Sequence, residues 1–168
     1  MAAGWFNLQA RNKETKIERG CILGEHPMYL RFIGPFPTEG HSRVRNCDYG
    51  LFQTAFRARD DYLIEPYLVD ALMREMDWFK EHLPSPDSDY FDAGGVNVGI
   101  CWFRDHAKTM IRRARRMVNI LSAGDIWVTE ARTDSPGHIL YRDDYQIIAQ
   151  PRKGTPTKWG QTKKHFRR

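Results

Sequence analysis

The sequence predicts an α+β fold in which two amphipathic helices pack against an antiparallel sheet. Apolar residues recur at helical spacing over residues 65–83 and again over 102–121. Short segments rich in branched and aromatic residues, bounded by glycine and proline, are typical of strands and lie towards both ends of the chain. Because the helices do not alternate with parallel strands, the sequence favours one antiparallel layer covered by helices.

The first third of the chain has weaker patterns. Residues 1–19 show no period and are expected to form an arm or a short helix. GCILG at 20–24 and MYLRFI at 28–33 predict a hairpin. Residues 34–50 hold two prolines and three glycines and predict a long loop, of a length that is more often functional than idle. The pattern of residues 51–62 is compatible with either a helix or an extended segment.

Residues 65–83 predict the first helix. One stripe is apolar and is made by Leu68, Leu72, Met76, Phe79 and Leu83. Pro66 suits the first turn of a helix, and Pro84 cannot continue one.

The segment from 102 to 121 predicts the central helix. Gly94, Gly95 and Gly99 make the chain before it a flexible connection with a brief strand at 96–98, and Gly124 is expected to end the helix. The expected buried face consists of Ala107, Met110, Ile111, Ala114, Met117, Val118 and Leu121.

Three strands are expected after the central helix. Residues 126–132 alternate as a half-buried strand does, and residues 138–141 and 145–149 flank a tight turn. Together they predict a three-stranded meander.

The 168 residues suffice for one domain, expected over 1–150, followed by a basic tail over 151–168. The tail holds seven lysines and arginines and no acid, whereas the other 150 residues carry 19 basic against 21 acidic groups. The chain's net charge of +5 therefore comes from the tail. Within the body, acids concentrate in residues 60–92 and basic residues in 104–116.

Three cysteines at wide spacing, without a secretory leader, predict a reducing, cytoplasmic setting. No run approaches the roughly 18 apolar residues of a membrane span, so no membrane partner is expected. No phosphate-binding glycine loop is present, and no cofactor is expected.

The arginines of the central helix leave two interpretations open. Arg112, Arg115 and Arg116, together on one face, could neutralise the phosphates of a nucleic acid. They could instead form ion pairs with acids of the first helix, and the segregation of charge favours this interpretation; the candidate acids are Asp70, Glu75, Asp77 and Glu81.

The tail gives a separate signal. Its basic residues are interleaved with aromatic rings, which is what single-stranded or structured RNA requires of a protein surface. The tail residues predicted to bind nucleic acid are Arg152, Lys153, Lys158, Trp159, Lys163, Lys164, Arg167 and Arg168. A basic tail can equally lie across an acidic protein surface, including residues 60–92 of the same chain.

These observations favour a non-enzymatic protein that docks on a nucleic acid or a ribonucleoprotein. The alternative is a protein–protein module, such as a phage-type inhibitor or an assembly subunit, that uses the acidic 60–92 face or the 34–50 loop.

An enzyme is less favoured. Glu130 and Arg132 on one strand, with Asp125 upstream, resemble the acid and cation of a metal-dependent nuclease, but a second metal-binding carboxylate is missing and lysine is the usual cation. His41 and Cys47 fall short of a zinc site, which needs four ligands. Cys101 with His106 has the residue types of a nucleophile and base, but a cysteine before an apolar helix face is more often structural. No catalytic or metal-binding residue is assigned.

Three segments carry a resemblance: EPYLVDALMREMDWFKEHLP, ICWFRDHA and TDSPGHILYRDDYQIIAQP. Together they resemble a group of short bacterial and phage-borne proteins without an assigned activity. The resemblance covers residues 65–151 and implies a bacterial or phage setting, with no role for any residue.

Overall fold

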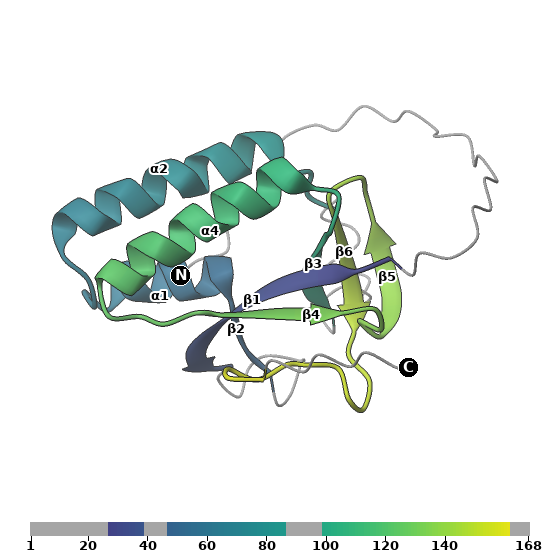
Figure 1. The fold of residues 1–168 in the computed structure, drawn as a ribbon. Helices are drawn as coiled ribbons and strands as arrows, with labels where there is room; N and C mark the ends of the chain where they lie inside the picture. The colour runs from purple at the N-terminus through teal and green to yellow at the C-terminus, as the bar shows by residue number, and fades with distance from the viewer. Residues whose placement is uncertain (1–26, 39–46, 87–98, 162–168) are drawn as a thin grey trace.

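The computed structural model describes residues 27–38, 47–86 and 99–161, in which three helices lie over a six-stranded antiparallel sheet (Figure 1). The predicted α+β class is confirmed. The helices are α1 (Leu51–Asp60), α2 (Pro66–His82) and α4 (Lys108–Ala123). The strands are β1 (Tyr29–Pro37), β2 (Asp48–Gly50), β3 (Ile100–Arg104), β4 (Thr129–Thr133), β5 (His138–Arg142) and β6 (Gln146–Gln150).

Strand β1 is the centre of the sheet. It pairs with β4 from Tyr29 to Ile33, with β3 at its first two residues and with β2 over its second half. Because successive side chains alternate, Leu30 and Phe32 enter the core beneath the helices, while Tyr29 and Ile33 enter a second cluster on the other face. Both faces of β1 are therefore buried.

The predicted C-terminal meander is only partly correct. Strands β5 and β6 form the expected hairpin, with His138 opposite Gln150. The strand expected at 126–132 does not join them, because β4 pairs with β1 and the second neighbour of β6 is β3. Consecutive strands are neighbours in only about two-thirds of cases, and alternation within β4 does not specify its partner.

The predicted start of the central helix is wrong. Trp102 and Phe103 belong to β3, and the helix begins at Lys108. Strand β3 lies between β1 and β6 with Ile100, Trp102 and Phe103 buried, so its apolar residues do not alternate with polar ones. A short apolar run of this kind cannot be distinguished from a helix start by periodicity. The expected buried face of the helix is confirmed at Met110, Ile111, Ala114, Met117 and Leu121.

Helix α2 agrees with the prediction for residues 65–83. Pro66 occupies its first turn, and Leu68, Leu72 and Phe79 are buried. The segment 51–62, for which helix and extended chain were both open, forms α1. This helix packs closely on β1, and Gly34 permits the close approach: a Cβ at this position would lie 2.0 Å from Thr54 Oγ1.

Several predictions lie wholly or partly outside the described residues: the arm at 1–19, the strands at 20–24 and 96–98, His41 in the predicted loop, and the last four tail cations, Lys163, Lys164, Arg167 and Arg168. Of the predicted 34–50 loop, β1 takes the residues up to Pro37 and β2 takes 48–50.

Candidate nucleic-acid interface

The described part of the tail, residues 151–161, runs along the side of the sheet away from α2 and α4 (Figure 1). Asp48 of β2 fixes it there. The Asp48 backbone N–H donates to the Thr157 carbonyl at 2.9 Å. The Asp48 carboxylate accepts hydrogen bonds from Lys158 Nζ at 3.1 Å and from the Trp159 backbone N–H at 2.7 Å. This section of the tail is therefore part of the folded domain, and an acid outside the 60–92 segment holds it.

The ring of Trp159 contacts the backbone of Trp127, two residues before β4. Trp159 Nε1 donates to the Trp127 carbonyl at 2.6 Å, and the next residue, Gly160, donates its N–H to Thr129 Oγ1 at 3.0 Å. The side chains nevertheless stay in solvent, with Trp127 60% and Trp159 46% exposed. Trp159 was predicted from the sequence as a binding residue, and Trp127 was not. Trp127 lies in the alternating segment 126–132, so the sequence indicated only a residue of a strand.

A buried guanidinium lies behind Asp48. Arg31 of β1 is buried, and its Nη2 donates to the Asp48 carbonyl at 2.9 Å. Burial lowers the pKa of Arg31. Its Nε and the indole Nε1 of buried Trp102 have no hydrogen-bond partner among the residues that the structure describes. The Asp48 carbonyl is thus a main acceptor for this cation, so the residue that holds the tail is itself held by the core.

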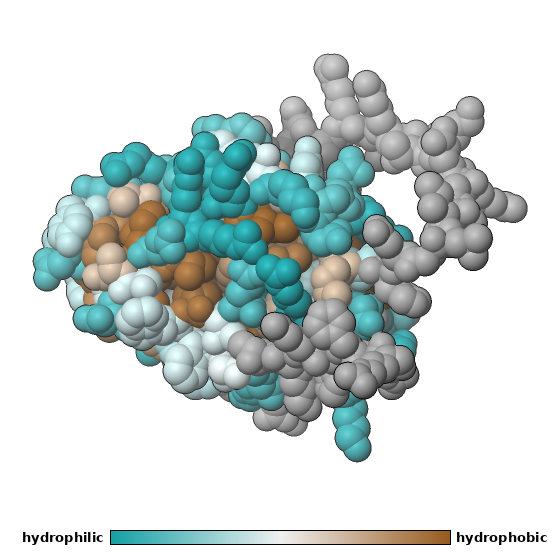
Figure 2. Space-filling view, viewed as in Figure 1, coloured by the Kyte–Doolittle hydropathy of each residue, from teal (hydrophilic) through white to brown (hydrophobic). Residues whose placement is uncertain are grey.

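The α4 arginines divide between two acids. In the space-filling view, hydrophilic side chains gather over α4, and a hydrophobic area is visible below them (Figure 2). On α2, Glu75 lies 3.1 Å from Arg113 Nη1 and 3.9 Å from Arg116 Nη1. The guanidinium of Arg113 also lies over the Trp78 ring, 4.6 Å from its centroid. Pairing with the acidic helix is therefore confirmed for Arg116. The shortest contact of Glu75, however, is with Arg113, which was not predicted from the sequence.

Arg115 pairs with β4 instead of α2. Its Nε and Nη2 each donate to a Glu130 oxygen at 3.0 Å, and Arg132 Nη2 donates to Glu130 Oε1 at 2.7 Å. Although partial burial raises the pKa of Glu130, the hydrogen bonds from Arg115 and Arg132 outweigh it, and the pKa is lowered. The hydrogen bond to Glu130 raises the pKa of Arg115. Two arginines share one acid, so this cluster retains net positive charge.

Other predicted cations remain exposed. Arg112 of α4 is exposed and makes no ion pair within the described residues. Arg152 and Lys153 are exposed at the start of the tail. The structure therefore brings Lys158 and Trp159 to β2 and β4, and it does not bring all of the predicted cations into one cluster.

The enzyme candidates gain no support from the geometry. Glu130 binds two arginines, and no group of three or more His, Cys, Asp and Glu residues in the described part of the chain could hold a metal ion. Cys47 is buried. Cys101 is on β3, and His106 is bound through Nε2 to the Asp144 carbonyl at 2.9 Å.

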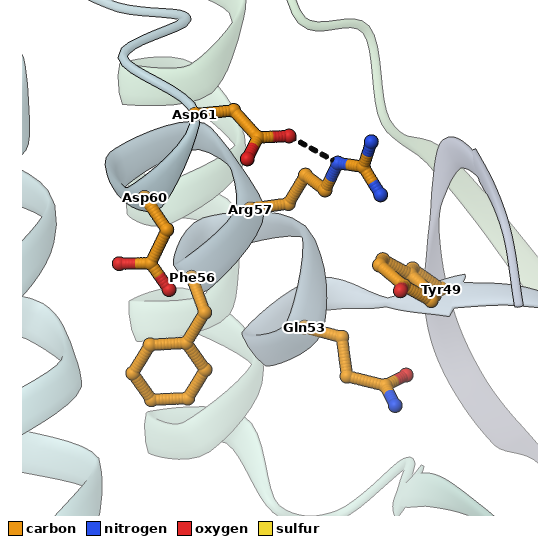
Figure 3. Close-up of a pocket in the computed structure, with 6 residues that line it drawn as sticks. All are labelled: Tyr49, Gln53, Phe56, Arg57, Asp60 and Asp61. Atoms are coloured by element: carbon orange, nitrogen blue, oxygen red, sulfur yellow. Dashed lines mark ion pairs between the residues drawn. The ribbon is translucent and has the colours of Figure 1, made fainter. Parts of the chain in front are cut away.

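A hollow of about 280 Å³ lies between β2 and α1 (Figure 3). Its lining residues are Tyr49, Gln53, Phe56, Arg57, Asp60 and Asp61. Its charged and amide side chains already have partners: Arg57 pairs with Asp61, Asp60 pairs with Arg59, and Gln53 Oε1 accepts the Gly50 N–H that precedes α1. This hollow is open and internally paired, and it offers no arrangement of nucleophile and base.

Comparison with known proteins returns no family model, no curated protein and no solved structure that matches this chain. No helix in the described residues is long and apolar enough to cross a membrane.

Proposed function

We propose that this protein binds single-stranded nucleic acid, alone or within a ribonucleoprotein, with Trp127 and Trp159 as the platform for unpaired bases. The hydrogen bond between them, together with their exposure, carries the proposal. Unpaired bases stack on exposed aromatic rings, and each such contact contributes about 1–3 kcal/mol of binding free energy. Duplex bases are already stacked on one another, so an aromatic platform favours single strands.

Cations near the tryptophans suit the phosphates. Lys158 precedes Trp159 and keeps a side chain that is 41% exposed. Arg132 and Arg115, paired with Glu130, lie on the helix side of β4, because Glu130 is opposite Phe32 in the sheet. Arg152 and Lys153 add exposed positive charge at the start of the tail, and Arg112 adds an exposed cation on α4, across the sheet from the tail. Each phosphate neutralised on a single strand contributes about −0.7 to the slope of log affinity against log salt.

The fixed position of Trp159 supports the same function. Because Asp48 and Thr129 hold the backbone on both sides of this ring, less conformational entropy is lost when a base stacks on it. The tail contributes an oriented ring and a lysine to a surface that also includes Trp127 and the start of β4.

The test is fluorescence anisotropy with a labelled 12-nucleotide oligo-U RNA, the matching oligo-dT and a 12-base-pair duplex, each over a salt series. We expect the single strands to bind more tightly than the duplex. Trp127→Ala and Trp159→Ala should each weaken single-strand binding about 5- to 100-fold, as the loss of one stacked base predicts.

Tyr145→Ala is the matched control, because Tyr145 is an exposed aromatic at the β5–β6 turn, away from the tail. It should leave binding unchanged. Absence of binding at low salt, or an equal loss in the Tyr145 variant, would refute the proposal.

A further inference from the structure

The corner between α1 and α2 presents apolar side chains to solvent. Tyr62 is 91% exposed, Tyr67 68% and Leu63 44%. A single exposed apolar residue needs no explanation, but three within the six residues from 62 to 67 form a cluster of the kind found at binding sites. We call these three residues the α1–α2 corner.

The backbone of Tyr62 is in the left-handed region, with φ 54°. The chain around it makes the hydrogen bonds of a glycine-type helix ending: the Tyr62 N–H donates to the Arg59 carbonyl at 3.2 Å, and the Leu63 N–H donates to the Ala58 carbonyl at 2.9 Å. Glycine favours this position because a Cβ is unfavourable there. Tyrosine thus destabilises the backbone here, and its exposed ring gains no packing in return.

The neighbouring residue makes the corner rigid. Ile64 is buried in the helix-side core, and a Cβ at Gly124, after α4, would lie 2.3 Å from Ile64 Cγ2. The contact between Ile64 and Gly124 therefore fixes the corner against the end of α4. A backbone held in this way presents the Tyr62 ring from a fixed position, so no backbone entropy of the corner needs to be lost on binding.

The charge around the corner is negative. Glu65 lies between Leu63 and Tyr67 and is exposed, and exposed Asp125 follows the Gly124 that contacts Ile64. Neither acid makes an ion pair with a described residue. Two other acids at the corner are paired, Asp60 with Arg59 and Asp61 with Arg57. Unpaired acids beside exposed tyrosines disfavour a phosphate backbone and favour cationic ligands.

We propose that the α1–α2 corner binds a basic segment of a partner protein, in which an apolar side chain lies between arginines or lysines. The apolar side chain would contact Leu63, the tyrosine rings would accept a guanidinium over their faces, and Glu65 and Asp125 would pair with the cations. Tyrosine is among the residue types that dominate protein interfaces. This site does not depend on the proposed binding of nucleic acid.

The test uses the full chain and a panel of fluorescent 12-residue peptides in which arginine and leucine are separated by one, two or three serines. A second panel replaces every arginine by glutamate. Anisotropy at physiological salt is expected to show binding by at least one arginine peptide and by no glutamate peptide.

Tyr62→Gly is the decisive variant, because glycine adopts φ 54° more readily than tyrosine. We expect it to weaken peptide binding at least tenfold while the melting temperature stays the same or rises, and oligo-U binding is expected to stay unchanged. Tyr62→Phe should retain peptide binding, and Tyr145→Gly should not affect it.

Three outcomes would overturn the proposal. One is failure of the whole arginine panel to bind, and another is equal binding by wild type and Tyr62→Gly. The third is a concentration-dependent dimer in sedimentation that Tyr62→Gly abolishes, because it would assign the corner to a second copy of the chain.

Discussion

Asp48 and Lys158 form an ion pair across the molecule, with Asp48 Oδ1 3.1 Å from Lys158 Nζ, and the same carboxylate also binds the backbone N–H of Trp159. One acid in the shortest strand thus determines where a basic, turn-rich segment lies. The pair withdraws part of the Lys158 charge from any phosphate, and it orients the ring beside it. The tail's binding capacity therefore depends on Asp48 as much as on the tail's own cations.

Asp48→Ala should lower the free energy of unfolding by about 1.5–3 kcal/mol, because the carboxylate accepts two hydrogen bonds, one of them from a cation. Urea denaturation measures this loss. Trypsin should also cut faster after Arg152, Lys153 and Lys158, since the segment is no longer held. Asp134→Ala removes an exposed acid at the β4–β5 turn and serves as the control. Equal digestion rates in the two variants would contradict the role of Asp48.

Arg113 and Arg112 are adjacent on α4 and should behave oppositely. Arg113 contacts both Glu75 oxygens and the Trp78 ring, so Arg113→Ala is expected to cost about 1–2 kcal/mol of stability. Arg112 is exposed, and Arg112→Ala should change stability by less than about 0.5 kcal/mol. Oligo-U binding should show the reverse order, with the larger loss in Arg112→Ala. A larger binding loss in Arg113→Ala would remove the outer face of α4 from the interface.

Glu130 should give stability a specific pH dependence. Its pKa in the folded protein is lowered from the ordinary value of 4.5, so its contribution is present above that value and is lost as the pH falls through the folded pKa. Wild type should be more stable than Glu130→Gln by about 1 kcal/mol near neutral pH. The difference should shrink below about pH 4.5. Urea denaturation at several pH values measures it, and a difference that stays constant in acid would contradict this assignment.

The same variant separates binding from nuclease chemistry. Glu130→Gln frees Arg115 and Arg132 from their shared acid, so oligo-U affinity should be retained or increased. A nuclease that used Glu130 would instead lose its metal-dependent cleavage on this substitution.

The sequence predicted the elements in which buried residues recur at the regular spacing of a helix or a strand. The stripe around Leu72 and the prolines at 66 and 84 were enough to place α2, because a helix with one buried face shows that face in its sequence. Strand β3 was missed because its adjacent residues Trp102 and Phe103 are buried on opposite faces, so its apolar residues show no alternation. The partner of β4 was missed because alternation specifies a buried face and leaves the neighbouring strand undetermined.

The candidate site was harder to predict, since its contacts join distant residues. Nothing near Asp48 in the sequence indicates a partner 110 residues away. The contact of Arg113 with α2 could have been predicted from the sequence. Arg113 lies three residues after Met110 and four before Met117, so it borders the buried stripe that faces α2. Tyr62 had no signal, since the backbone conformation it adopts normally selects glycine.

The placement of β1 at the centre of the sheet also bears on how the chain folds. Tyr29 pairs with Thr133, and Asp48 meets Lys158, so the sheet closes only when segments about a hundred residues apart in the sequence come together. Such long-range closure slows folding relative to helix formation. During synthesis, α1 and α2 can form while β1 still lacks β4 and the tail. Until those segments emerge, the apolar side chains of β1 are open to aggregation, and docking of residues 157–160 completes the domain.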